Sequence, residues 1–208
     1  MANLYFRYAT MNAGKSYDLI KVANNYEEKG VKVLTLKPSI DTKEKNYISS
    51  RIGIKREADY LIDGSIIELL TGKLDDVSCI FVDEAQFLTA KQVDELDIIS
   101  KVLDIPVVCY GLRVNFQNKM FEGSKRLMEL ADELSQIETM CECGNIARSV
   151  GRKVSGEYVS SGDEVIIDGE DDIEYVPLCE ECYLKKVKKL NFNKIKQKIK
   201  RWKTWMIV

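Results

Sequence analysis

The sequence predicts an α/β fold built around a parallel sheet. Short apolar runs typical of strands alternate with segments of helical periodicity as far as about residue 140. A glycine-bearing turn joins the first apolar run to the first helical segment, and a second apolar run follows, which is the order of a parallel-sheet unit. The chain has 208 residues, of which 45% are hydrophobic, 31% are charged and three are prolines. This length and composition suit one globular domain with a small appendage.

The first predicted strand covers residues 4–8. Helical spacing begins at Ser16 and ends at Lys29-Gly30, and residues 31–36 predict a second strand. Residues 37–56 are polar and rich in lysine, so we expect a mobile loop there rather than a regular element.

The same alternation continues toward residue 140. In chain order, the pattern predicts a helix, a strand, a helix, a strand and a helix over residues 65–70, 79–82, 89–103, 106–110 and 123–134. Thr89 is the candidate N-cap of the middle helix. The buried side of the last helix is marked by Leu127, Leu130, Ala131 and Leu134. Beyond residue 140 we expect short strands and turns enclosed by pairs of cysteines.

The composition excludes several kinds of active site. The chain contains no histidine, which removes Ser-His-Asp triads, Cys-His pairs and histidine-bound zinc. All 33 acidic residues lie at or before Glu181, whereas ten of the 31 Lys and Arg residues lie within residues 185–203. An acidic body is a poor surface for a polyanion, so a phosphate site in it must be local and built from backbone dipoles and one or two cations.

A phosphate-binding loop is predicted directly after the first strand. Its residues match the pattern G-x-x-x-x-G-K-[ST] except at the first position, where alanine is acceptable if the backbone is extended. In such a loop the N–H groups surround a β-phosphate, the lysine reaches the γ-phosphate and the hydroxyl binds Mg²⁺. The loop consists of Ala9, Thr10, Met11, Asn12, Ala13, Gly14, Lys15 and Ser16.

A second motif agrees with a nucleotide site. The apolar strand over residues 79–82 is followed by Asp83-Glu84, and a carboxylate at the end of a buried strand can hold the Mg²⁺ of a bound nucleotide. Glu84 is a candidate to orient or deprotonate an attacking hydroxyl. Without the phosphate-binding loop, the same acidic pair would only mark a strand that ends in water.

The six cysteines are of two kinds. Cys79 and Cys109 stand singly in apolar runs, and we interpret them as small buried side chains. The other four form close pairs on either side of a 35-residue segment, which favours a structural zinc site because four thiolates close a tetrahedral shell. Disulfides or unrelated surface cysteines are the alternative, and a reducing compartment disfavours disulfides. The predicted zinc ligands are Cys141, Cys143, Cys179 and Cys182.

No targeting or membrane signal is visible in the sequence. The chain does not open with the basic, apolar and small-residue order of a secretory signal, and no run approaches the roughly 20 apolar residues of a membrane span. We therefore expect a cytoplasmic protein with reduced thiols and without a membrane partner.

Several motifs occur in one fixed order along the chain, at residues 11–16, 83–87, 110–112 and 121–124 and at the two cysteine pairs. In that order they resemble the type II thymidine kinases of bacteria and animal cytosol, over residues 3–184. The resemblance implies a RecA-like P-loop domain (1–140), a small zinc-bearing lasso domain (141–184), a basic extension (185–208) and a homotetramer. It also implies the reaction: transfer of the γ-phosphate of ATP to the 5′-hydroxyl of thymidine, and also of deoxyuridine, to supply dTMP for DNA synthesis by nucleotide salvage.

The resemblance assigns roles to individual residues. Residues 9–16 hold the ATP phosphates together with Mg²⁺, which Ser16 and Asp83 bind, and Glu84 is the base near the 5′-hydroxyl. The ATP-binding set is completed by Asp83, Glu84, Ala85 and Gln86. The nucleoside pocket is formed by Phe87, Leu112, Phe116, Phe121 and Tyr175.

Three departures from the family pattern stand out. Asp41-Thr42-Lys43 replaces an Asp-x-Arg motif, so a planar bidentate contact to phosphate becomes a point charge. Asn115-Phe116-Gln117 stands where bacterial relatives often have Asp-Phe-Arg. The lasso segment from Gly169 to Tyr175 is longer and strongly acidic.

The basic tail leaves an alternative function open. A P-loop ATPase acting on nucleic acid would use a zinc ribbon and this tail as contacts, with Trp202 and Trp205 stacking on bases. Against it, the tail also fits a helical extension that docks Leu190, Phe192, Ile195 and Ile199 on the body or on a neighbouring subunit. We favour the second interpretation and expect no nucleic-acid partner.

Overall fold

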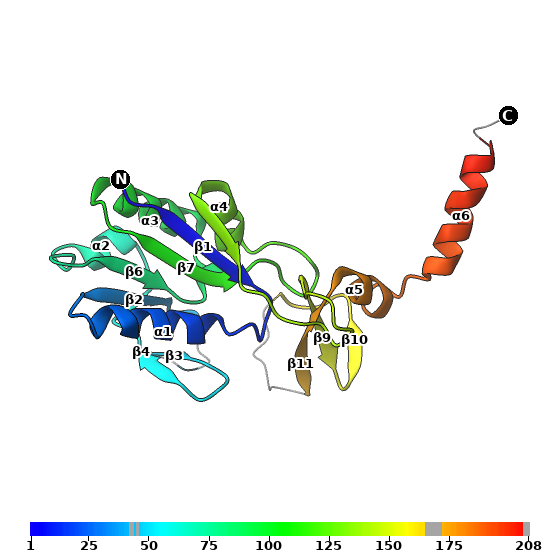
Figure 1. Cartoon of the computed structure of the whole chain (residues 1–208), viewed down its shortest axis with the longest axis horizontal. Helices are drawn as coiled ribbons and strands as arrows, with labels where there is room; N and C mark the ends of the chain where they lie inside the picture. Colours follow the sequence, from blue (N-terminus) through cyan, green and yellow to red (C-terminus); the bar gives the residue numbers. More distant parts are fainter. Residues whose placement is uncertain (42–43, 45, 165–171, 206–208) are drawn as a thin grey trace.

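The computed structural model describes residues 1–41, 44, 46–164 and 172–205, and it confirms the predicted α/β fold. Its centre is a six-stranded sheet with the order β5-β2-β6-β7-β1-β8, in which every neighbouring pair is parallel (Figure 1). The strands of this sheet are β1 (Leu4–Ala9), β2 (Val33–Pro38), β5 (Tyr60–Ile62), β6 (Cys79–Val82), β7 (Val107–Leu112) and β8 (Glu133–Gln136).

Helices cover both faces of the sheet. Successive side chains of a strand point to opposite faces, so Cys79 and Phe81 of β6 pack with α1, whereas Ile80 and Val82 pack with the helices of the other face. Strands buried on both faces are apolar throughout, which is why β6 could be recognised from its composition. One face is covered by α1 (Lys15–Glu27) and the other by α2 (Ile66–Leu70), α3 (Ala90–Val102) and α4 (Glu122–Leu130).

The predicted N-cap of α3 and the interpretation of the two single cysteines are confirmed. Thr89 caps α3 in a capping box with Gln92. Cys79 and Cys109 are free and buried, and burial raises the pKa of Cys79 to about 12 and raises that of Cys109 further. Both thiols are therefore core side chains.

A hairpin occupies residues 47–57, where we expect a mobile loop from the sequence. β3 (Tyr47–Ser49) and β4 (Lys55–Glu57) pair antiparallel. Ile48 is fully buried in the core cluster formed with α1, and Arg56 donates two hydrogen bonds of 2.7 Å to the carboxylate of Glu27 at the end of that helix. The expectation of a loop is wrong for these residues because packing on α1, rather than local composition, stabilises the hairpin.

The helix predicted over residues 123–134 ends earlier than its pattern suggests. The backbone is extended at Ala131, the carboxylate of Asp132 accepts the N–H of Leu4 at 2.7 Å, and β8 then pairs with β1. Leu134 is consequently a strand residue that is 46% exposed, not part of a buried helix face. Residues 133–136 form a strand because the backbone groups at the edge of β1 need hydrogen-bond partners.

A second, smaller sheet follows the central one. β9 (Ser149–Val154) lies between β10 (Glu157–Val159) and β11 (Ile173–Leu178), and both pairings are antiparallel. A short helix, α5 (Glu180–Lys186), packs against this sheet, as the right-hand part of Figure 1 shows.

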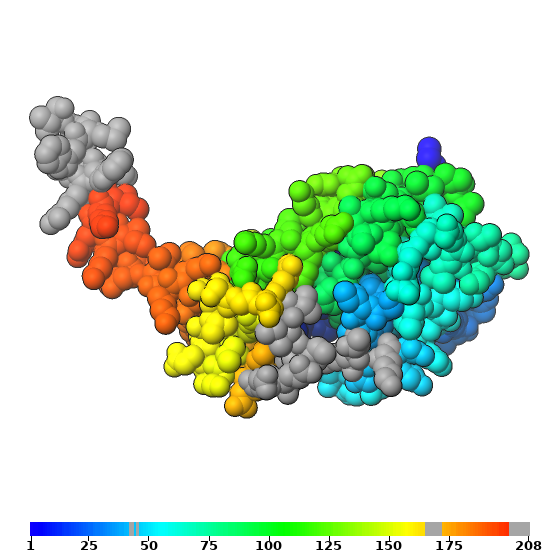
Figure 2. Space-filling model, turned by 180° about the vertical axis from the view of Figure 1, so that it is seen from behind, coloured from blue at the N-terminus to red at the C-terminus, as the bar shows by residue number. Residues whose placement is uncertain are grey.

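The last helix, α6 (Phe192–Trp205), extends away from the rest of the molecule (Figures 1 and 2). Leu190, Ile195 and Ile199 are 40%, 38% and 56% exposed, so they are not docked on the body of their own chain. Phe192 is half-buried, and the ammonium of Lys185 lies 5.2 Å from the centroid of its ring. Within the described residues, no helix is long and apolar enough to span a membrane.

Candidate active site

The loop after β1 has the backbone needed to bind phosphate. Ala9 is the last residue of an extended strand, so the absence of a glycine there introduces no strain. The left-handed positions are Asn12 (φ 65°) and Gly14 (φ 80°), both residue types that tolerate this conformation. Gly14 precedes α1 and has no side chain to cap it, which leaves the N–H groups of the first turn for an anionic ligand. Lys15 begins the helix and is buried.

Asp83, the residue after β6, lies next to this loop. The Ser16 hydroxyl donates a 2.9 Å hydrogen bond to Asp83 Oδ2, whereas Oδ1 is buried and has no hydrogen-bond partner among the described residues. The pKa of Asp83 is raised, because burial and the neighbouring charge of Glu84 outweigh the lowering effects of Lys15 and the Ser16 hydroxyl. A buried carboxylate with one oxygen unpaired beside a hydroxyl offers the hard oxygen ligands that Mg²⁺ prefers.

Glu84 is held in place by the residues that follow it. Its backbone is left-handed (φ 49°), and it opens the short 3₁₀ turn η1 (Ala85–Phe87). The amide Nε2 of buried Gln86 donates to Glu84 Oε2 at 2.5 Å, and Gln86 Oε1 accepts the N–H of Leu112 at 2.9 Å. A Cβ at Gly111 would lie 2.9 Å from Gln86 Oε1, so glycine is required for this close approach. Gln86, which is itself anchored to the end of β7, therefore fixes the direction of the Glu84 carboxylate.

The phosphate-binding loop, Asp83, Glu84 and Leu112 contribute to the wall of one pocket of about 530 Å³. Its wall combines the phosphate-binding loop with the ends of β6 and β7, and the opposite side comes from the β3–β4 hairpin. Of the predicted site residues, those that line it are Met11, Asn12, Ala13, Gly14, Lys15, Ser16, Asp83, Glu84 and Leu112. The remaining predicted residues, Ala9, Thr10, Ala85, Gln86, Phe87, Phe116, Phe121 and Tyr175, are not part of this wall.

No motif in the sequence points to the side of the pocket formed by the β3–β4 hairpin and Lys37. Lys37 is almost fully buried there; its ammonium group lies 2.9 Å from Asp41 Oδ2 and donates to the carbonyl of Tyr47 at 3.0 Å. The only signal was the abundance of lysine in residues 37–56, which is equally typical of an exposed loop. Thr42 and Lys43 of the altered family motif lie outside the described residues, as do residues 169–171 of the acidic lasso segment.

An apolar cluster adjoins the pocket on the side of the small sheet. Phe116 and Tyr175 are buried together with Val150 and Ile173, and Met11 of the phosphate-binding loop packs against them. Asn12 Nδ2 also lies 3.4 Å from the carbonyl of Tyr175.

Phe87 and Phe121 form a separate contact. Their rings meet edge to face with centroids 5.9 Å apart, where η1 approaches the start of α4. The structure thus divides the five predicted nucleoside-binding residues: Leu112 lines the pocket, Phe116 and Tyr175 share one cluster, and Phe87 and Phe121 form a pair.

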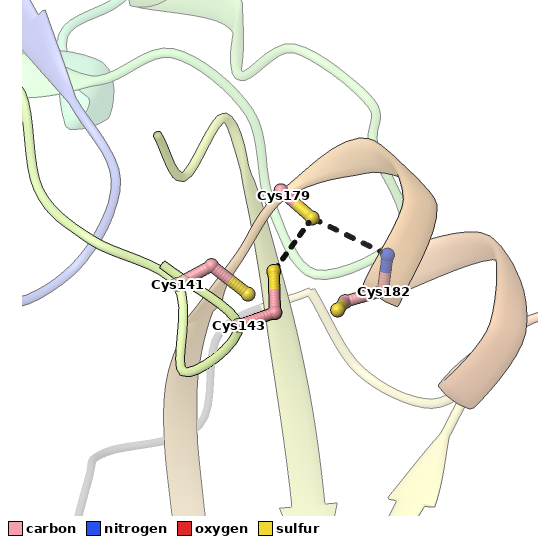
Figure 3. Close-up of side chains that lie close together, drawn as sticks. All are labelled: Cys141, Cys143, Cys179 and Cys182. Atoms are coloured by element: carbon pink, nitrogen blue, oxygen red, sulfur yellow. Dashed lines mark hydrogen bonds between the residues drawn. The ribbon is translucent and has the colours of Figure 1, made fainter. Parts of the chain in front are cut away.

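The four paired cysteines converge on one point, with their sulfur atoms directed toward one another (Figure 3). Cys141 and Cys143 come from the turn before β9, and Cys179 and Cys182 from the start of α5. All four sulfurs lie within 4.8 Å of one another, and none is in a disulfide.

The surroundings of these sulfurs act in opposite directions on two of the thiols: they lower the pKa of Cys141, whereas burial and hydrogen bonds with the other three thiols raise the pKa of Cys182. Burial opposes ionisation of Cys141, but hydrogen bonds from the backbone N–H groups of Cys143 and Cys179 outweigh it and lower its pKa to about 7. Four sulfurs in this arrangement are compatible with a zinc site, and such a site would be structural because the ligand shell is complete.

Comparisons with known proteins agree with this geometry. The family model "Thymidine kinase" matches residues 2–183. The thymidine kinase of Enterobacteria phage T4 is 44% identical over 195 residues, which cover 91% of this chain and 100% of the relative. The thymidine kinase of Streptococcus agalactiae serotype Ia is 40% identical over 186 residues, covering 88% of this chain and 97% of the relative. That of Streptococcus gordonii is 40% identical over 188 residues, with 89% and 97% covered. With a phosphate-binding loop, an acidic strand end and a four-cysteine cluster in these positions, the chain belongs to the thymidine kinase family.

Proposed function

We propose that this protein transfers the γ-phosphate of ATP to the 5′-hydroxyl of thymidine, and also of deoxyuridine, in the pocket between the phosphate-binding loop and the end of β6. The hydrogen bond from Ser16 to Asp83 carries the proposal, because it joins two motifs 67 residues apart at one pocket. Family membership supports the reaction. It also disfavours an ATPase acting on nucleic acid, for which no described feature beyond the basic tail argues.

The phosphate-binding loop would hold ATP through two kinds of contact. The free N–H groups at the start of α1 would bind phosphate oxygens, and the buried ammonium of Lys15 would neutralise charge on the γ-phosphate. Ser16 and the unpaired Oδ1 of Asp83 would hold Mg²⁺, which would supply positive charge to neutralise the phosphates. Asp83 would bind the ion in its ionised form.

Glu84 would act on the acceptor alcohol. Phosphoryl transfer has a loose transition state, so alignment of the hydroxyl matters more than a strong base. Gln86, itself fixed to β7, directs the Glu84 carboxylate. Glu84 would therefore orient the 5′-hydroxyl and accept its proton late in the reaction.

The nucleoside would bind where the pocket meets the apolar cluster of Phe116 and Tyr175. Met11 belongs to both, so a flat pyrimidine base placed there would contact apolar side chains and lie within reach of the phosphate-binding loop. Zinc at the four cysteines would connect the turn before β9 to α5 and so support this side of the site. A homotetramer stays a prediction, which analytical ultracentrifugation would test.

A phosphate-transfer assay with γ-labelled ATP and each of the four common deoxynucleosides tests the function. We expect label to transfer to thymidine, and to deoxyuridine when it is added as a fifth acceptor, with little transfer to the purine deoxynucleosides. A parallel reaction with single-stranded DNA in place of a nucleoside tests the rival ATPase. ATP consumption that requires DNA and yields no labelled nucleotide would refute the proposed function.

A further inference from the structure

The centre of the small sheet contains a buried arginine with unusual partners. Arg152 in β9 is 2% exposed, and its guanidinium carbon lies 3.6 Å from the centroid of the Phe116 ring. Nη1 donates to the carbonyl of Asp163 at 2.7 Å, and Nη2 to that of Ser161 at 3.3 Å. Among the described residues, no carboxylate lies within ion-pair distance of the group, and Nε has no partner.

This arrangement is costly and specific to arginine. A buried charge without a counter-ion is strongly unfavourable unless other interactions compensate for it. Among the residues that the structure describes, an aromatic face and two carbonyls compensate for the charge, and only a planar guanidinium can stack on a ring while it donates sideways to separate acceptors. A residue with only a packing role could be aliphatic, so the retained charge indicates that the contacts themselves matter.

Two other side chains also hold the segment 161–164 by hydrogen bonds. Asn115 Nδ2 donates to Glu164 Oε1 at 2.9 Å, and Gln117 Nε2 donates to the carbonyl of Gly162 at 3.1 Å. Gly162 has a φ of 128°, and a Cβ there would lie 2.3 Å from Arg152 Nη2. The chain therefore wraps around the guanidinium closely enough to require glycine.

Hydrogen bonds also fix the backbone on both sides of Phe116. Asn115 Oδ1 accepts the N–H groups of Gln117 and Lys119 at 2.9 and 3.0 Å, which closes the turn that presents the ring. The hydroxyl of Tyr183, in the helix that bears the second cysteine pair, donates to the carbonyl of Phe116 at 2.9 Å. Asn115 and Gln117, which stand where the family pattern has charged residues, therefore both donate hydrogen bonds that hold this part of the chain.

We propose that Arg152 is a positioning residue for nucleoside binding, because it fixes the Phe116 ring and the segment 161–164 in the arrangement that receives the base. The inference rests on the thymidine kinase activity proposed above and adds a residue outside the pocket wall. None of the described contacts of Arg152 involves Lys15, Asp83 or Glu84. The effect should therefore fall on thymidine affinity and leave ATP binding and the transfer step intact.

Steady-state kinetics of Arg152→Lys and Arg152→Met test this role. Lysine keeps the charge but loses the planar fork, and we expect the KM for thymidine to rise about tenfold while kcat and the KM for ATP stay within about twofold of the wild type. Methionine removes the charge as well and should raise the KM further, so lysine gives partial rescue. Equilibrium titration with thymidine should show matching changes in Kd.

Two further variants keep the test decisive. Gln117→Ala removes one hydrogen bond to the same segment without touching the buried charge, and it should raise the KM for thymidine about threefold. Lys153→Met is the matched control: Lys153 is the next residue of β9, points to the other face and pairs with Glu174 at 3.0 Å. Its loss should leave the KM for thymidine unchanged.

An unchanged KM for thymidine in both Arg152→Lys and Gln117→Ala would overturn the proposal. So would a loss of activity that tracks the loss of folded protein at unchanged KM, because that result describes a purely structural residue. These outcomes are distinct from failure of the proposed function, in which the wild-type protein itself transfers no phosphate to thymidine.

Discussion

Two adjacent carboxylates in the pocket have different surroundings and should respond differently to substitution. Asp83 is buried against Ser16, whereas Glu84 is partly exposed and directed by Gln86. Neutralising Asp83 would affect the nucleotide side of the site. Glu84 can be tested without disturbing its neighbours, because an amide of the same shape can still accept the hydrogen bond from Gln86.

We predict that Glu84→Gln lowers kcat for thymidine by at least about 100-fold, since it removes the proton acceptor. ATP binding should survive, because Glu84 makes no contact with the phosphate-binding loop in the described hydrogen bonds. Phosphate-transfer kinetics and an ATP titration measure the two effects. Glu68→Gln, an exposed glutamate on α2, is the control. A near-normal kcat for Glu84→Gln would show that the assigned role is wrong.

Lys15→Ala should weaken both ATP binding and turnover. The buried ammonium is the only cation contributed by the phosphate-binding loop, so its removal leaves the γ-phosphate charge uncompensated. Equilibrium titration with ATP and the transfer assay together measure the loss, and Lys91→Ala, whose side chain is 82% exposed, serves as control. Unchanged affinity and rate would reject the site.

Asp18 should make stability depend on acid pH. Burial alone would raise its pKa, but hydrogen bonds from Lys21, Arg7 and Tyr110 outweigh burial and lower the pKa. A lowered folded-state pKa means that the stabilisation is complete above the ordinary carboxyl value of about 3.9 and disappears as the pH falls through the lower folded value.

Asp18→Asn should therefore reduce the free energy of unfolding by about 1 kcal/mol near pH 7. The difference from the wild type should shrink as the pH falls below about 4. Urea unfolding at a series of pH values measures it, with Asp97→Asn on α3 as a control that should show no such trend. A difference that stays constant down to pH 3 would contradict the linkage.

At the scale of elements, the small sheet depends on the cysteine cluster. One of its two buried clusters, around Leu178 and Tyr183, consists of six residues, and two of these are cysteines. With so few apolar residues in that cluster, we expect a metal bound by the cysteines to contribute much of the stability there.

We expect the purified protein to contain about one zinc ion per chain. Cys182→Ser should lower the zinc content and the temperature of unfolding, measured by metal analysis and calorimetry. Cys109→Ala, which alters a buried thiol outside the cluster, should lower stability but keep the zinc. Full zinc content in Cys182→Ser would show that this residue is not a ligand.

At the scale of the whole molecule, catalysis should be independent of the basic tail. The family match ends at residue 183, and α6 extends away from the rest of the molecule (Figure 1). A chain ending at Leu190 should therefore keep the kcat and the KM for thymidine of the complete chain within about twofold. Loss of activity on truncation, with the body still folded by circular dichroism, would show that the tail contributes to the site.

The sequence determined the features that depend on residues close together along the chain. The phosphate-binding loop, the strand that ends in Asp83, the Thr89 cap and the two cysteine pairs are all local patterns, each with a direct chemical meaning. They were sufficient for the fold class and for the resemblance to the family.

Tertiary structure alone decided the features that depend on partners far away in sequence. β8 forms because β1 offers an unpaired edge, and the β3–β4 hairpin forms because Ile48 and Arg56 find partners on α1. Arg152 is similar: its sequence neighbours suggest an ordinary strand position, and only the fold brings Phe116 and the segment 161–164 around its charge. Short strands and buried charges have little local preference of their own, so the free energy of long-range contacts determines where they occur.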